Sequence, residues 1–331
     1  NPIKSKNPFS KNINKSNLLK MELTSQFKEN VVNALIQARE RYTGNTKSFC
    51  KQFGISDSIF SRMKSGEREQ ILSDAKWISA ARSLGVEQSK RTWKLARTEV
   101  FEQIEYDIKM CQENGRAMVF VDDCAIGKSF AAKYLCRMVL KNAFYLDCSQ
   151  CKTKIEFIRE LARAIGVDSG GRVIDVRSDI IYSLKNLDSP VVVLDEAGDM
   201  GYQAFLEIKS LYNAVDGYCG WYMIGADGMR AKIERGVRSK KVGFREILSR
   251  FSDTFLSIVP IGKDDRRDFY KTLITEVVSV NIPDKKDLAF LVKKCMEPNS
   301  AGDISGLRRV ETILLEFIKN KTDSNEKYIN Q

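Results

Sequence analysis

A lysine and a hydroxyl residue follow a glycine at Gly127-Lys128-Ser129. The triplet comes after the apolar run 117–121 and a loop, and it opens the helical-looking segment KSFAAKYLCRMVL. Strand, loop and helix in this order form a phosphate cradle, because the first amides of a helix and its dipole attract anions. Lys128 is expected to reach the β- and γ-phosphates of a nucleotide, and Ser129 to ligate Mg²⁺. The predicted nucleotide-binding residues of this loop are Cys124, Ala125, Ile126, Gly127, Lys128, Ser129 and Phe130.

Two positions of the loop depart from the pattern G-x-x-x-x-G-K-[S/T]. Asp122 stands where the first glycine belongs, and Ala125 stands where many such loops have another. Aspartate tolerates left-handed backbone better than most residues, so we expect about 1 kcal/mol of strain rather than loss of the cradle. A carboxylate pointing at the phosphates would weaken binding, and one pointing outward would change little. We predict an altered but working site.

A second acidic signal follows 67 residues after Lys128. The apolar run VVVLDE, 191–196, is typical of a buried strand that ends in two acids. Asp195 is predicted to hold the metal, directly or through water, and Glu196 to polarise the attacking water. ATP and Mg²⁺ are therefore the expected cofactors.

From 117 onward, short apolar runs alternate with helical patterns. The predicted strands are 117–121, 142–148, 191–196, 220–226 and 255–261. This alternation predicts an α/β fold, with a parallel sheet covered by helices on both faces. A last helical block is expected from Asp264 to the end, and a further helix at 98–114 before the first strand.

The N-terminal third is basic and helical. Residues 1–100 carry 19 Lys and Arg against 9 Asp and Glu, and the rest of the chain 35 against 34. Gly54 breaks a helical pattern and Ser56 can cap a helix from Asp57, which predicts a helix-turn-helix; a plain helical bundle is the alternative. A basic segment favours double-stranded DNA as partner over a merely solvated surface. The predicted DNA contacts here are Lys47, Lys51, Asp57, Ser58, Ser61, Arg62 and Lys64.

Composition excludes several classes of protein. The chain contains no histidine, which excludes histidine-based triads. Its eight cysteines are spaced too irregularly for a disulfide scaffold, and Cys148-x-x-Cys151 lacks the partners of a zinc site; reduced thiols are expected, with redox chemistry as the alternative. No apolar run is long enough to span a membrane and no secretory pattern is visible, so we expect a cytoplasmic protein without membrane contact.

The order of these motifs resembles the core of AAA+ ATPases: phosphate loop, acidic strand, sensor strand and arginine finger. The resemblance implies that Asp227, just after the strand 221–225, fills the sensor-1 role, and that Arg250, or else Arg245, enters the site of a neighbouring subunit. AGDISGLRRVETILLEF, 301–317, is similar to the sensor-2 helix. Ser305 stands where that arginine belongs, and Arg308 is the nearby candidate for nucleotide contact.

Within AAA+ proteins, the domain order resembles the phage Mu B family of target-selecting transposition ATPases over about residues 25–318. The resemblance implies a mobile-element protein of bacteria or phages that assembles head-to-tail on DNA, as a filament or oligomer, and activates a cognate transposase. Lys152, Thr153, Lys154, Lys240 and Lys241 would line the inner DNA surface.

The predicted domains follow from these motifs. They are a flexible basic arm (1–22), a helix-turn-helix domain (23–85), a linker (86–97), an AAA+ core (98–262) and a C-terminal helical lid (263–331). Two other functions stay open. One is a replication initiator or helicase loader, and the other is a helix-turn-helix regulator that senses nucleotide without hydrolysing it.

Overall fold

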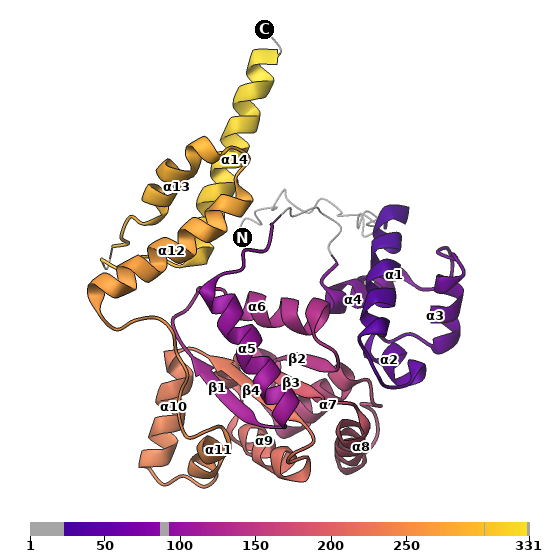
Figure 1. Ribbon diagram of the computed structural model, residues 1–331. Coiled ribbons are helices and arrows are strands. Elements are labelled where there is room, and N and C mark those ends of the chain that lie inside the picture. The colour runs from indigo at the N-terminus through magenta and orange to yellow at the C-terminus, as the bar shows by residue number, and fades with distance from the viewer. Residues whose placement is uncertain (1–22, 87–92, 301, 330–331) are drawn as a thin grey trace, which may run out of the picture.

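The computed structural model describes residues 23–86, 93–300 and 302–329, the last eight of these by their backbone alone. The predicted arm and residues 87–92, half of the predicted linker, therefore lie outside the described residues. A four-stranded sheet carries helices on both faces, with one group of helices at each end of the chain (Figure 1). This arrangement confirms the α/β fold class.

All neighbouring strands of the sheet run parallel. The strands are β1 (Ala117–Val121), β2 (Ala143–Asp147), β3 (Val191–Asp195) and β4 (Gly220–Gly225), in the spatial order β1-β4-β3-β2. In register, Val121 lies opposite Gly225, and Asp147 opposite Asp195. The carboxyl ends of all four strands therefore meet at one edge, where open α/β sheets bind their ligands.

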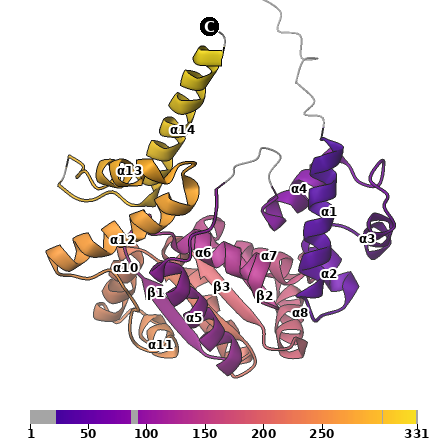
Figure 2. The same ribbon diagram turned by 45° about the horizontal axis from the view of Figure 1, so that its top comes forward.

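Alternation along the strands gives the sheet two apolar faces. Val191 and Val193 face one cluster, and Val192 and Leu194 the other, as the period of two requires. Helices α5 (Glu99–Asn114) and α6 (Lys128–Tyr134), the latter continued by the π-turn η1 (Leu135–Val139), cover the first face. Figure 2 shows this layering, in which the other face carries α7 (Lys154–Ile165), α8 (Val173–Asn186), α9 (Tyr202–Ala214), α10 (Asp227–Arg238) and α11 (Phe244–Arg250).

Two elements differ from the sequence prediction. The run 255–261 is not a strand, because only Leu256 bridges to Phe120 beside β1. The amides of Ile258 and Val259 donate to the Asp122 side chain instead of a neighbouring strand, so the ladder stops there. In addition, α8 occupies a segment for which no element was predicted.

Four helices form the N-terminal group: α1 (Ser25–Glu40), α2 (Thr46–Gln52), α3 (Asp57–Lys64) and α4 (Asp74–Leu84). Ser56 caps α3 as predicted, its side chain accepting from the Ile59 amide at 3.3 Å. A turn of four residues joins α2 to α3, an arrangement that permits a helix-turn-helix but does not establish one.

These helices pack directly on the sheet domain. Their buried residues belong to the same apolar cluster as the α7 face of the sheet. The Tyr42 hydroxyl and the Gln52 amide both donate to the Ile165 carbonyl at the end of α7, at 3.4 and 2.9 Å. A Cβ on Gly166 would lie 2.1 Å from the Ser48 carbonyl oxygen, so the glycine permits this close approach.

The C-terminal group has its own core. It consists of α12 (Lys263–Asn281), α13 (Leu288–Cys295) and α14 (Leu307–Ile329), packed through a separate cluster of buried residues. Trp93 and Ala96 join that cluster, and the Asn281 side chain bonds the backbone of Lys94 at both its N–H and its carbonyl. The segment that leads into α5 is therefore tied to these helices, which we call the lid.

Candidate nucleotide site

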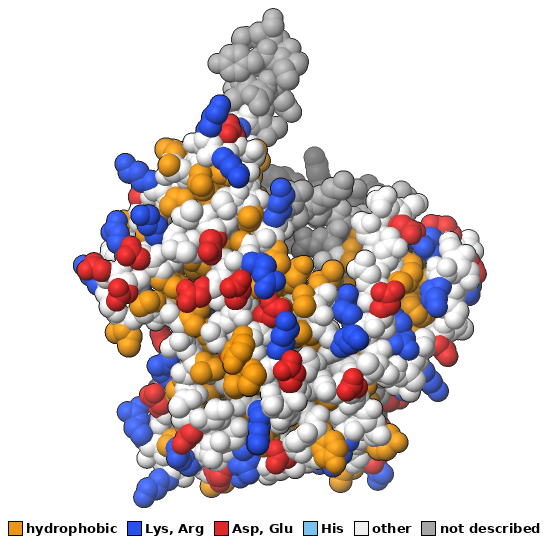
Figure 3. All heavy atoms as spheres, viewed as in Figure 1, with side chains coloured by type: hydrophobic (Ala, Val, Ile, Leu, Met, Phe, Trp, Pro, Cys, Tyr) orange, Lys and Arg blue, Asp and Glu red, His pale blue; other side chains and the backbone are white. Residues whose placement is uncertain are grey.

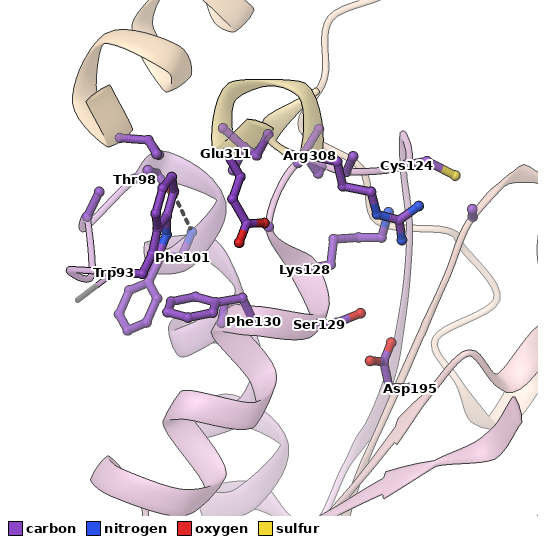
Figure 4. A pocket seen from close by; sticks show the side chains of 18 of the residues that line it. Trp93, Thr98, Phe101, Cys124, Lys128, Ser129, Phe130, Asp195, Arg308 and Glu311 are labelled. Carbon is purple, nitrogen blue, oxygen red and sulfur yellow. Dashed lines mark hydrogen bonds between the residues drawn. The ribbon is translucent and has the colours of Figure 1, made fainter. Parts of the chain in front are cut away.

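A pocket of about 640 Å³ opens at the carboxyl ends of β1, β3 and β4, beneath the lid (Figure 4). Four separate segments line it. They are the loop and helix start 124–131, the strand ends Asp195, Glu196, Gly225 and Ala226, the lid residues Val277, Leu307, Arg308 and Glu311, and the entry residues Gly85, Trp93, Lys94, Ala96, Thr98 and Phe101. All seven predicted loop residues are therefore gathered in one cavity, together with both acids of β3.

The loop presents the start of α6 to this pocket. Gly127 precedes the helix with φ 102°, a left-handed conformation that favours glycine. The first N–H groups of a helix have no partner within it, so those of α6 are available to an anion. Ala125 also has a positive φ, 59°, whereas Asp122 does not. The strained left-handed backbone is therefore at Ala125. The prediction that Asp122 would adopt it was wrong.

Asp122 points away from the pocket. Its Oδ2 accepts from the amides of Ile258 and Val259 at 2.6 and 3.1 Å, and its Oδ1 accepts from the Asp123 amide at 2.8 Å. The side chain is buried and does not line the cavity. Of the two orientations that the sequence left open, the structure has the one that spares the phosphates.

Lys128 lies under the loop, with its amino group donating to the carbonyls of Asp122, at 2.8 Å, and Asp123. Burial lowers the pKa of this amine, while the nearby acids, Asp195 and Glu196 among them, act in the opposite direction. A buried cation needs acceptors. The loop carbonyls supply them here, and phosphate oxygens would supply them in a nucleotide complex.

The two acids at the end of β3 differ in their surroundings. Asp195 is buried, its Oδ1 accepting from the Glu196 amide at 3.0 Å and its Oδ2 from the Tyr145 hydroxyl at 2.5 Å. Burial, together with this carboxylate, raises the pKa of Tyr145, so its hydroxyl keeps its proton. Glu196 has a left-handed φ of 52° and an exposed side chain at the pocket wall. Its desolvation, and then the charge of Asp195, raise its pKa above the usual 4.5.

The residues fit a magnesium–nucleotide complex. Mg²⁺ in nucleotide sites usually takes one or two protein oxygens, with phosphates and water completing its shell. Ser129 and Asp195 supply such oxygens at the wall of the pocket (Figure 4). Among the described residues no group of three or more acidic or thiol side chains forms a cage for a metal alone.

The opposite end of the pocket is aromatic. Figure 4 shows Trp93, Phe101 and Phe130 grouped away from Asp195. Phe130 is exposed and its ring stacks on that of Tyr134, with the ring centroids 6.4 Å apart. Trp93 and Phe101 were not among the predicted site residues. A tryptophan inside the polar connection RTWKLART was the available signal, since such a ring needs something to pack against.

The lid closes the pocket from above. The Leu307 amide, at the first residue of α14, donates to the Ala125 carbonyl at 2.6 Å. Arg308, the next residue, and Glu311, one turn further along α14, also line the cavity. Arg308 is the residue of this helix that the sequence predicted for nucleotide contact. Ser305 is not part of the lining. The phosphate loop and the lid are therefore in direct backbone contact.

Three residues predicted for catalysis lie outside this pocket. Asp227 is exposed at the start of α10, just beyond the lining residue Ala226. Arg250 donates to the Asn213 side chain and the Glu246 carbonyl, and Arg245 pairs with Asp253. A role for either arginine in hydrolysis would have to be played in the pocket of another chain.

The seven predicted DNA contacts of the N-terminal group are exposed on α2 and α3. Some already have partners: Arg62 pairs with Glu67 at 2.7 Å, and the Lys64 amino group lies 5.9 Å from the centre of the Phe60 ring. Figure 3 shows basic and acidic side chains interspersed over this end of the molecule. Binding of DNA here stays a prediction.

The second predicted DNA set lies on the α7–α9–α10 side. Lys152 donates to the Asp199 carbonyl, and the Lys241 amino group lies 4.0 Å from the centre of the Tyr202 ring. Both lysines therefore contact the segment 199–202. Lys154, in contrast, pairs with the buried Glu207 at 2.6 Å. Thr153 caps α7, and Lys240 is exposed with φ 52°. In Figure 3, basic side chains gather over the α10–α11 corner.

The cysteines and helices add two findings. All eight cysteines are free, and Cys148 and Cys151 are both buried. Within the described part of the chain, no helix is long and apolar enough to cross a membrane.

Comparison with known proteins supports the ATPase interpretation for the sheet domain. No curated protein matches the chain. Residues 111–233, which run from the end of α5 through β4 into α10, match the family model described as an AAA domain. This segment carries the phosphate loop and both acids of β3, and the fold around it is that of an α/β P-loop core. The match indicates an AAA+ ATPase family for this part of the chain.

Proposed function

We propose that this protein is an ATP-dependent DNA-binding ATPase of DNA transposition, which assembles on target DNA and recruits or activates a transposase. The observation that carries the ATPase part is the convergence of the α6 start, Lys128, Ser129, Asp195 and Glu196 on one pocket. In this proposal Lys128 and the loop amides bind the phosphates, while Ser129 and Asp195 hold Mg²⁺. Glu196 then orients and polarises the attacking water.

Direct contact between the nucleotide pocket and the N-terminal helices supports a link between ATP and DNA. Gly85, the C-cap of α4, lines the pocket, and Arg137, which follows α6, donates to the Arg82 carbonyl on α4. A change in the position of α6 on nucleotide binding would reach α4 through these contacts. Helices α2 and α3, which carry the predicted DNA residues, pack into the same group through their buried side chains.

The transposition role and the transposase partner rest on the resemblance in domain order alone. A replication initiator or helicase loader would share the ATPase and DNA properties but bind a helicase. A regulator that does not hydrolyse ATP would explain why Asp122 and Ser305 depart from the ATPase motifs. Asp122 gives this alternative little support, because its side chain faces away from the pocket.

Duplex DNA binding in the presence of ATP and Mg²⁺ tests this proposal. The parent protein is expected to bind only with nucleotide, and its affinity to fall about 10³-fold or more between 50 and 200 mM salt if six or more phosphates are contacted. Lys128→Ala is expected to lose the nucleotide-dependent binding. Lys141→Ala, which removes an exposed lysine outside the pocket lining, is the matched control.

Electron microscopy of the same mixtures separates the readings. Filaments or rings that coat DNA favour the transposition ATPase, and pull-down with a transposase or a helicase then distinguishes it from a loader. Discrete dimers on one sequence, without hydrolysis, would instead support the regulator. Tight DNA binding by Lys128→Ala would contradict the coupling.

A further inference from the structure

Tyr145 lies one strand away from the pocket, yet it contacts the predicted metal ligand. It belongs to β2, which pairs with β3 in the register Tyr145 opposite Val193. Tyr145, Val193 and Asp195 lie on the same face of the sheet, the face covered by α5 and α6. The tyrosine side chain extends along this face toward the strand ends, and its hydroxyl meets Asp195 Oδ2 at 2.5 Å.

This bond and the Glu196 amide together fix the Asp195 carboxylate. Each of its oxygens accepts from one donor, at 2.5 and 3.0 Å. A carboxylate oxygen can accept two hydrogen bonds, so each oxygen keeps one lone pair for a cation or for a water that the cation holds. Because the residue is only 3% exposed, solvent does little to orient it.

The tyrosine is itself held by the helix that carries the phosphate loop. The Lys133 amino group lies 5.3 Å from the centre of the Tyr145 ring. Lys133 and Ser129 are four residues apart on α6 and therefore share a face of the helix. The helix that presents Ser129 to the pocket thus also braces the ring that holds Asp195.

We propose that Tyr145 is a positioning residue, which fixes Asp195 for the magnesium ion of the bound nucleotide. This inference rests on the proposed ATPase function. Partners that orient a metal ligand typically affect metal affinity about 10- to 100-fold when they are removed. Loss of the hydroxyl is therefore expected to weaken the response to Mg²⁺ and to leave metal-free nucleotide binding unchanged.

The chain offers a matched control in Tyr222. This tyrosine of β4 is fully buried, and its hydroxyl donates to a buried carboxylate, that of Asp107 on α5, at 2.8 Å. Neither Tyr222 nor Asp107 lines the pocket. Tyr222→Phe therefore removes a bond of the same kind without touching the metal ligand.

The experiment is calorimetric titration of the full chain with ADP, first with a chelator and then over a series of Mg²⁺ concentrations. The Mg²⁺ concentration for half-maximal effect is expected to rise about tenfold in Tyr145→Phe and to stay at the parent value in Tyr222→Phe. Metal-free affinity should be equal in all three proteins. Asp195→Asn should abolish the Mg²⁺ response, and adding Tyr145→Phe to it should cause no further loss.

Urea unfolding of each variant accompanies the titrations. Tyr145→Met, a second variant without the hydroxyl, replaces Tyr145→Phe if the latter does not fold, with the same expectation. A parent-like Mg²⁺ requirement in the folded Tyr145 variant, or an equal loss of metal-free binding, would overturn the inference. If the parent itself binds no nucleotide, the proposed function fails instead.

Discussion

At position 122 an aspartate replaces the glycine of most phosphate loops, and its carboxylate accepts hydrogen bonds from three backbone amides. Two of them, from Ile258 and Val259, belong to the segment that lies beside β1. The residue thus fastens the start of the loop to the chain that leads into the lid. Its polar contacts are structural, although its place in the motif is that of a nucleotide-binding residue.

Restoring the glycine is therefore expected to harm the protein. Asp122→Gly leaves buried amides without acceptors, so the free energy of unfolding should fall by about 1–3 kcal/mol. Nucleotide affinity of the folded protein should change less than threefold, because the side chain lies outside the pocket. Urea unfolding and calorimetry measure the two quantities.

Asp122→Asn serves as the intermediate variant, since its amide oxygen can still accept from one segment. A glycine variant that is as stable as the parent, or that binds nucleotide much more tightly, would show that the carboxylate is not a structural clamp.

Glu196 carries a prediction about pH. Its pKa is raised above the usual 4.5, chiefly by desolvation, so it takes up a proton at a higher pH than an unperturbed glutamate. Hydrolysis needs the carboxylate. Activity should therefore be complete above the raised pKa and be lost as pH falls through it, and the acid limb of kcat/KM, which reports the free enzyme, should lie above pH 4.5.

Glu196→Gln provides the comparison. It is expected to lose hydrolysis while it still binds Mg·ATP, because the residue is not needed to hold the phosphates. An acid limb at the unperturbed pKa of glutamate, or hydrolysis that persists in Glu196→Gln, would mean that another group polarises the attacking water.

At the level of single residues, the sequence predicted much of the candidate site. Gly127, Lys128, Ser129 and the acids of β3 follow from a local pattern with a known geometry, and they do meet in one pocket. Trp93 and Tyr145 could not be predicted in the same way. Trp93 contributes by packing against the lid, and Tyr145 by its hydrogen bond to Asp195 of β3. Both partners are distant in the chain, so no local sequence pattern predicts these contacts.

Among the elements, the start of α14 and the phosphate loop are in direct backbone contact. The Leu307 amide bonds the Ala125 carbonyl, and a Cβ on Gly306 would lie 2.5 Å from that same oxygen. Gly306 is therefore a glycine that close packing requires, since no side chain fits between the two backbones.

Gly306→Ala is expected to push α14 away from the loop. Losing one backbone hydrogen bond of this kind costs about 1 kcal/mol, so nucleotide affinity should fall by about five- to tenfold. Stability of the sheet domain should change little, because the lid has a separate core. Calorimetry with ATP measures the effect.

Gly170→Ala is the control, because there the added methyl would meet only the exposed Asp168 side chain, 3.2 Å away. Equal affinities for the two variants and the parent would mean that the lid can shift without cost, and that its contact with Ala125 does not hold the nucleotide.

The elements themselves were largely predictable, because apolar runs and caps are local signals. The exceptions are instructive. The run 255–261 has the composition of a strand, but Asp122 takes its amides, and nothing near 258 in the sequence indicates that. Helix α8 has charged and apolar residues mixed around most of its circumference, and only Val176, Ile180 and Leu184 are buried, so its pattern was weak.

On the scale of the whole molecule, the N-terminal helices, sheet domain and lid all contribute to the wall of one pocket. Gly85, the strand ends and Arg308 represent the three parts. A nucleotide that fills this pocket would contact all three parts, and its binding energy would be shared among them.

Neighbouring chains complete the site in the proposed mechanism, and mixing two inactive variants tests this. Arg250→Ala lacks the proposed finger, and Lys128→Ala lacks the phosphate-binding lysine. In a head-to-tail oligomer, a Lys128→Ala chain can lend its arginine to an Arg250→Ala neighbour, so an equal mixture should regain about a quarter of the parent ATPase rate per chain.

A mixture of Lys128→Ala with Glu196→Gln should regain nothing, since both changes disable the pocket that the chain itself supplies. The same test with Arg245→Ala decides between the two arginines. Activity in the unmixed Arg250→Ala and Arg245→Ala proteins equal to the parent would rule out both as fingers.

The position of Trp93 gives this protein a built-in optical reporter. The chain has three tryptophans, and Trp77 and Trp221 are fully enclosed in the interior, far from any solvent change. Only the indole of Trp93 faces the cavity. Its emission should shift in wavelength or be quenched as the cavity fills, so occupancy can be followed in real time without any label, and Trp93→Phe should silence that signal.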